Sequence, residues 1–110
     1  MSTDQESVLI LLIERLRDPE LTVRIHAGLQ LGQMGIEARP ALPALLELRQ
    51  SEDVHDRRLA ALVLGSLAHD VTEATSPLLH ALNDADEAVC RLAAEALDAI
   101  APHRGHRKAA

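Results

Sequence analysis

Apolar residues recur along the chain with the period of amphipathic helices. Near the N-terminus, four of them stand at positions i, i+3, i+4 and i+7, namely Leu9, Leu12, Ile13 and Leu16. A second stripe follows after a short polar segment and consists of Val23, Ala27, Leu31 and Met34. This spacing places each set on one face of a helix. The sequence therefore predicts a helix, a short turn and a second helix.

The same pattern returns every 33 residues. Three apolar pairs mark the interval: Leu12-Ile13, Leu45-Leu46 and Leu78-Leu79. Three copies in register indicate a solenoid, because no single unit of this kind could bury its apolar face alone. We expect one domain over residues 1–101, with units at about 7–35, 40–68 and 73–101, and a flexible basic tail at 102–110.

Turn-forming residues separate the predicted helices. Proline fits a helix start and is excluded from a helix interior, and Pro40, Pro43 and Pro77 stand where the first helices of units two and three should begin. Polar residues of the kind that cap helices precede each second helix: Asp18, Ser51 and Asp84. We therefore predict these three as N-caps, with Glu87 completing a capping box on Asp84.

The identity of the repeat depends on its motif. Tetratricopeptide units require aromatic residues that this chain lacks, and an ankyrin-like start is present in one copy alone. The units do contain Pro40-Ala41-Leu42, Val23-Arg24 and Leu31-Gly32. These segments resemble the short bacterial HEAT-like repeat, the type also found in phycocyanobilin lyase subunits, and the resemblance extends over roughly residues 7–101.

Three residues depart from that family pattern. Asp56 replaces a valine, Cys90 replaces an arginine and Asp98 replaces a glycine. We expect these departures to make the packing between units irregular.

The resemblance implies an all-α fold, specifically a right-handed α-solenoid of three two-helix HEAT-like repeats. It also implies a ladder in which Arg24 and Arg57 face the acidic caps of the neighbouring unit. HEAT-like arrays generally bind other proteins along the curved face made by their second helices, so the likeness favours a protein-binding role.

Composition excludes several functions. The 110 residues include no Phe, Trp or Tyr, and aromatic cages, base-stacking platforms and membrane-interface belts all need such rings. A formal net charge of −6 repels phosphate backbones, so we expect no nucleic-acid partner. The apolar run at 8–13 is too short to span a bilayer and no basic segment precedes it. We therefore expect a cytoplasmic protein with no membrane contact.

Candidate chemistry is sparse. The single cysteine, Cys90, excludes an intrachain disulfide and a cysteine-based zinc site. His55-Asp56 and His69-Asp70 occur at different points of their units, so they cannot form the symmetric ligand pairs of a di-metal HEAT-like enzyme such as deoxyhypusine hydroxylase. Neither a nucleophile–base constellation nor a glycine-rich phosphate loop is present. We predict no catalytic residue, no metal and no cofactor.

Two surfaces are candidates for binding another protein. On the second helices, an apolar patch with a basic edge would consist of Ile25, Leu29, Arg58 and Leu62, unless neighbouring helices tilt and bury these side chains. At the N-terminus, Ile10 and Leu11 have no earlier unit to cover them. They would pack against a second copy in a homodimer, against another partner or against a further solenoid, unless the N-terminal segment folds over them.

These patterns predict a non-catalytic protein–protein interaction or scaffold module. The alternative is an accessory subunit of a larger enzyme assembly, bilin-lyase-like or metal-dependent, in which another chain performs the chemistry. Aromatic residues are the commonest interface anchors, and this chain has none. We therefore expect modest affinity per contact, or an aromatic anchor supplied by the partner.

Overall fold

The computed structural model describes residues 3–101, and this part of the chain is all-helical, which confirms the prediction of an all-α fold. Its α-helices are α1 (Thr3–Arg15), α2 (Leu21–Met34), α3 (Leu42–Arg49), α4 (Val54–Leu67), α5 (Thr75–Ala81) and α6 (Glu87–Ile100). Two 3-10 segments, η1 (Gly35–Ala41) and η2 (Thr72–Ala74), lead into α3 and α5. The predicted tail at 102–110 lies outside the described residues. Within residues 3–101, every helix is too short or too polar to cross a lipid bilayer.

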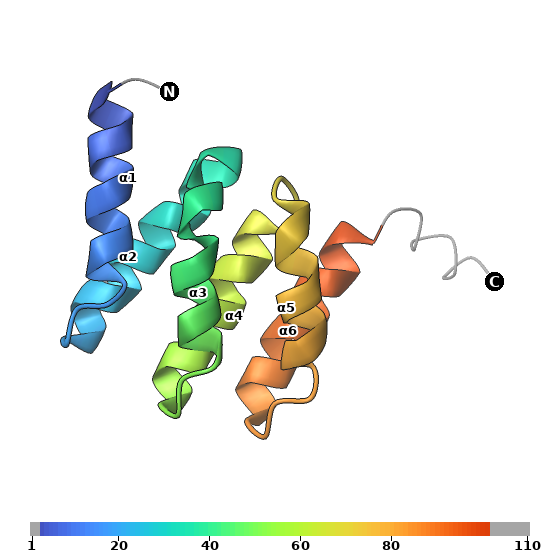
Figure 1. Cartoon of the computed structure of the whole chain (residues 1–110). Helices are drawn as coiled ribbons and strands as arrows, with labels where there is room; N and C mark the ends of the chain where they lie inside the picture. Colours follow the sequence, from blue (N-terminus) through green and yellow to red (C-terminus); the bar gives the residue numbers. More distant parts are fainter. Residues whose placement is uncertain (1–2, 102–110) are drawn as a thin grey trace.

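The helices are arranged as three neighbouring pairs. α1 packs on α2, α3 on α4 and α5 on α6, while α4 lies between α2 and α6. Figure 1 shows α1, α3 and α5 in one row, with α2, α4 and α6 behind them in a second row. The helices of the second row have 14 residues each and begin 33 residues apart. The sequence period is therefore also the spacing at which these helices start.

The core of the described helices is aliphatic. Its largest fully buried side chains come from all three pairs: Leu16, Leu31, Leu45, Leu64, Leu67, Leu78, Val63, Val71 and Val89. Alanine stands at the equivalent position of each second helix, and Ala27, Ala60 and Ala93 are 1%, 0% and 0% exposed. Because the distance between packed helices depends on the side chains at their contact, these small residues allow a close approach.

The second helices begin two residues later than the sequence predicts. The observed N-caps are Glu20, Asp53 and Asp86. The prediction of Asp18, Ser51 and Asp84 as N-caps is therefore wrong. Glu87 is the first residue of α6, so the predicted capping box on Asp84 is wrong as well.

The predicted cap residues shape the turn before each helix instead. Asp18, Ser51 and Asp84 each accept a hydrogen bond from the backbone N–H two residues on, at 2.8, 3.1 and 2.8 Å. A short polar side chain that bonds in this way forms an Asx or ST turn. The same oxygen is then engaged in the turn rather than in capping the helix, and the N-cap lies two residues further on, at Glu20, Asp53 or Asp86.

The contact between α4 and α6 requires a glycine. A β-carbon at Gly65 would lie 2.8 Å from Cβ of Ala96, closer than two carbon atoms can approach. Similarly, a β-carbon at Gly28 would lie 3.0 Å from the side chains of Leu59 and Val63. Glycine destabilises a helix interior, so its presence in α2 and α4 follows from the lack of space between the second helices.

Replacing Gly65 with alanine should therefore destabilise the fold. Alanine gains about 1 kcal/mol in helix propensity, whereas the overlap with Ala96 costs roughly 1–3 kcal/mol. We expect Gly65→Ala to lower the free energy of unfolding by about 1 kcal/mol, measured by urea denaturation with circular dichroism. In an Ala96→Gly background the same substitution should raise stability, because the colliding methyl group is gone. A stabilising effect in the unmodified chain would contradict the close contact.

Candidate functional site

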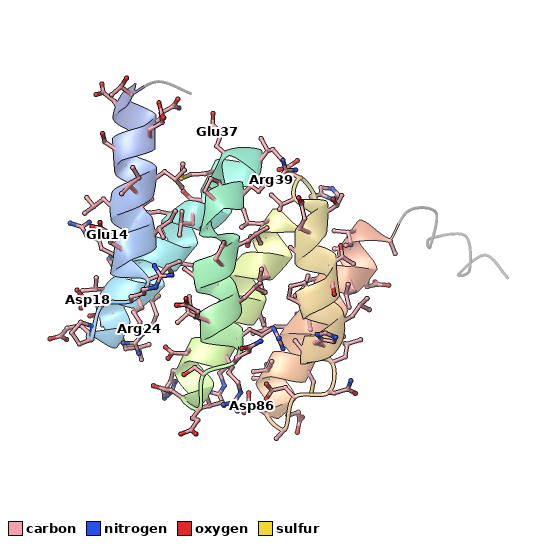
Figure 2. All side chains as sticks on the ribbon, in the orientation of Figure 1. Glu14, Asp18, Arg24, Glu37, Arg39 and Asp86 are labelled. Carbon is pink, nitrogen blue, oxygen red and sulfur yellow. The ribbon has the colours of Figure 1, made fainter. Side chains whose placement is uncertain are left out.

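Two arginines, Arg24 in α2 and Arg57 in α4, each connect their own helix to the following helix pair. Nε of Arg24 in α2 donates to Asp56 of α4 at 2.9 Å, and Nε of Arg57 in α4 donates to Asp84, just before α6, at 2.9 Å. Nη1 of Arg24 also donates to the backbone oxygen of Asp18 at 2.8 Å, in the turn before its own helix. Figure 2 shows Arg24 beside Asp18, at the end of the molecule where α1 turns into α2. Each arginine thus joins two units through charge-assisted hydrogen bonds.

Asp56 supplies the closest carboxylate partner of Arg24 in the second unit, at 2.9 Å, whereas Asp53 lies 3.8 Å from the guanidinium. The position of Asp84 in the third unit is occupied in the second unit by Ser51, which cannot form an ion pair. Asp56 accepts a hydrogen bond from Oγ of Ser51 at 2.9 Å and pairs with Arg24 at 2.9 Å. This departure from the repeat pattern therefore moves the carboxylate from the turn into the helix and keeps the contact between the units.

Cys90 ends this series of contacts in the third unit. It occupies the position of Arg24 and Arg57, and its Sγ donates to the backbone oxygen of Asp84 at 2.9 Å. Arg57 makes the equivalent bond from Nη1 to the backbone oxygen of Ser51 at 3.0 Å. The thiol replaces this bond within the unit. The cysteine side chain is too short to reach a further unit, and it carries no positive charge with which to form an ion pair there.

Removing the Asp56 carboxylate should deprive Arg24, whose guanidinium is largely shielded from water, of its closest ion-pair partner and leave it the carboxylate of Asp53 at 3.8 Å. We expect Asp56→Val to lower the free energy of unfolding by roughly 1–3 kcal/mol. Adding Ser51→Asp should recover at least half of the loss, because a carboxylate then stands at the position from which Asp84 contacts Arg57. Urea denaturation of both single variants and the double variant measures the coupling. Strictly additive effects would contradict the role assigned to Asp56.

The second-helix row exposes two leucines at equivalent positions. Leu29 of α2 and Leu62 of α4 are 44% and 41% exposed, although they are large and apolar. Ile25, one turn before Leu29, is half-buried and packs against the core. A shallow groove of about 250 Å³ lies between α4 and α6, and its lining includes Leu62 and Glu95. Of the predicted apolar patch, Leu29 and Leu62 are thus on the surface, and Ile25 is partly covered.

The predicted basic edge is engaged in an ion pair. Arg58 donates to both carboxylate oxygens of Asp86, from Nε and Nη2, at 2.9 Å each. This hydrogen bonding lowers the pKa of Asp86 from its usual 3.8 to about 2 and raises the pKa of Arg58. Sequence reasoning did not pair these residues, because they are 28 positions apart and meet only when α4 packs beside α6.

Replacing Arg58 with alanine should return the pKa of Asp86 from about 2 toward 3.8. Because the folded-state pKa lies below the usual value, ionised Asp86 stabilises the fold above pH 3.8 and that contribution disappears as the pH falls through about 2. Arg58→Ala should therefore flatten this acid-side change in stability. Carboxyl carbon NMR titration gives the pKa directly, and Arg91→Ala is the control. An Asp86 pKa unchanged by Arg58→Ala would contradict the pairing.

At the N-terminal edge, Ile10 and Leu11 are 58% and 43% exposed. Residues 3–7 do not fold over them, since they form the first turns of α1. The two residues lie on different faces of the helix. Ile10 is equivalent to Pro43 and Ser76, which are both exposed, so its position faces outward in every unit.

Other exposed apolar residues are absent from the predicted set. Val8 is 50% exposed and lies three residues before Leu11, a spacing that places both on one helix face. At the opposite edge, Leu79 and Leu82 are 50% and 39% exposed, because no described helix pair follows α6 to cover them. The sequence signal that could have identified these residues is the 33-residue repeat, because it shows which positions a neighbouring unit would cover.

The described residues contain no group of three or more His, Cys, Asp or Glu side chains that could hold a metal ion. His103 and His106 lie outside that part of the chain.

No protein-family model matches the chain, and a search of curated proteins finds no match either.

Proposed function

We propose that the chain is a right-handed α-solenoid of three HEAT-like repeats that acts in the cytoplasm as a non-catalytic protein-interaction or scaffold module. The solenoid assignment is supported by the 33-residue spacing of α2, α4 and α6 and by the succession of three helix pairs. The partner binds along the row of second helices or at the apolar N-terminal edge.

The observation that carries this proposal is the repeated exposure of leucine on the second helices. Leu29 and Leu62 stand at equivalent positions of adjacent helices, and each exposes more than two fifths of its surface. The third equivalent position is Glu95, so the apolar surface ends at α6 with a carboxylate. An apolar area with a polar border is the usual composition of a protein-binding site.

The chemistry of this surface indicates the kind of partner that it accepts. The groove between α4 and α6 has a volume of about 250 Å³, with Leu62 and Leu92 among its lining residues and Glu95 beside them. An aromatic or aliphatic side chain of the partner would fill it, and a neighbouring Lys or Arg would pair with Glu95. This arrangement compensates for the lack of aromatic residues in the chain itself.

A second candidate function is that of an accessory subunit in a larger enzyme assembly. The exposure of Leu79 and Leu82 at the C-terminal edge favours it, because a subunit with neighbours on several sides needs apolar surface at each of them. In that case another chain performs the chemistry and this chain contributes a binding surface.

Charged substitutions on the second helices test the proposal. We expect the double variant Leu29→Lys/Leu62→Lys to recover its partner from cell extract at least tenfold less efficiently, because burying each leucine contributes about 1.5–3 kcal/mol. Quantitative affinity purification with mass spectrometry measures recovery. The matched control is Ile36→Lys in η1, which is 48% exposed and lies outside every surface proposed above. Equal recovery by all variants would exclude the second-helix row as the binding surface.

A further inference from the structure

One face of α1 carries four exposed residues with the spacing of a helix-packing surface. Asp4, Val8, Leu11 and Arg15 are separated by four, three and four residues, which places them in one row along the helix. We name this row the edge stripe. Val8 and Leu11 form its apolar centre, while Asp4 and Arg15 form an acidic end and a basic end. All four side chains are exposed.

The centre of the edge stripe corresponds to positions that are covered in the other helix pairs. The residues equivalent to Val8 and Leu11 are all buried: Ala41, Ala44, Ala74 and Pro77. Ala44 is 2% exposed and lines the same cavity as Leu16 of the first pair, so it lies at the junction with the preceding pair. Among the described residues no helix precedes α1, and the edge stripe is uncovered. Its side chains are also larger than the alanines and proline that pack beneath a preceding pair.

A single helix fits this edge better than a further helix pair would. α2 presents His26 and Gln30 at the edge, and both are exposed. The equivalent residues of α4, Leu59 and Val63, are 4% and 1% exposed where α2 packs against them. A preceding pair would therefore have to bury two polar side chains on α2, at a free-energy cost unless each found a hydrogen-bond partner. A helix that contacts α1 alone avoids this cost.

The charges of the edge stripe indicate which helix that is. An acidic end, an apolar centre and a basic end make the stripe complementary to itself when two copies run antiparallel. Asp4 then faces Arg15 of the second copy, and Val8 faces Leu11 of the second copy. A parallel arrangement would place like charges together, which disfavours it. Neither Asp4 nor Arg15 forms an ion pair within the described residues, so both are available.

We propose that the chain forms a twofold homodimer in which α1 packs antiparallel against α1 of a second copy. Each contact occurs twice, as in any interface with twofold symmetry. The inference rests on the part of the proposed function that assigns binding to the N-terminal edge, and it names a second copy as the partner there. The contact involves one helix of 13 residues per chain, so its area is at the low end for specific interfaces and we expect a dissociation constant on the order of 10–100 μM.

Sedimentation equilibrium of the full chain between about 10 μM and 1 mM tests the dimer, since this range brackets the expected dissociation constant. We expect a mass rising from 11.9 kDa toward twice that value. Leu11→Lys should weaken dimerisation at least 30-fold, because it buries a charge in the apolar centre. Ile10→Lys is the matched control, since Ile10 is more exposed than Leu11 (58% against 43%) but lies outside the edge stripe, and it should leave the mass unchanged. Circular dichroism confirms that both variants remain helical.

Charge reversal tests the antiparallel arrangement. Asp4→Arg and Arg15→Glu each place like charges together at both ends of the dimer, and each should weaken it about tenfold. An equimolar mixture of the two variants restores opposite charges at both ends and should dimerise within about threefold of the unmodified chain. A parallel contact predicts a different outcome: each single variant still faces like charges, as the unmodified chain does, so neither weakens the dimer, and the mixture is tighter than the unmodified chain.

Several results would overturn the proposal. These are a monomer at 1 mM, species larger than a dimer, equal weakening by Ile10→Lys and Leu11→Lys, or a mixture no tighter than its components. A monomeric chain that still loses its partner through Leu29→Lys/Leu62→Lys would refute the dimer and support the proposed function. A chain that dimerises as expected, but whose partner recovery is unaffected by that double variant, would support the dimer and refute binding along the second-helix row.

Discussion

The close approach of α2, α4 and α6 is the constraint on which the rest of the structure depends. Small residues make it possible, with buried alanines at equivalent positions and Gly65 facing Ala96. At this separation, arginines near the start of one second helix come within 2.9 Å of carboxylates in the next pair. The same packing leaves Leu29 and Leu62 on the outside of the row. Core, ion pairs and binding surface therefore share one physical origin.

Much of the fold follows from local sequence patterns because each pattern occurs three times. Apolar spacing identifies the helices, and the 33-residue interval identifies the pairs. The N-caps could not be predicted from the local sequence, because Asp18, Ser51 and Asp84 each stand among several polar residues that can cap a helix. In the structure their side chains accept hydrogen bonds from the backbone N–H two residues on instead. The pairing of Arg58 with Asp86 did not follow either, since it depends on the separation of two helices and on no local pattern.

The sequence predicts an exposed apolar patch on the second helices, but it does not predict which of the patch residues are on the surface. Leu29 and Leu62 are exposed, but Ile25, only one turn before Leu29, packs against the core. At the N-terminal edge, adjacent residues of α1 point in directions about 100° apart, so Ile10 and Leu11 face different directions. The equivalent positions in the later units distinguish them, because one set is exposed and the other is buried.

Cys90 has a consequence for how such an array can grow. Lengthening by duplication requires each copied unit to offer a cation to its new neighbour. The second unit can be copied, because it has both Arg57 for the following unit and Asp56 for the preceding one. A copy of the third unit would add another thiol that bonds to its own turn, and the new junction would lack an arginine. A duplication of either of the first two units would therefore keep the arginine–carboxylate contact at its new junction, whereas a duplication of the third would not.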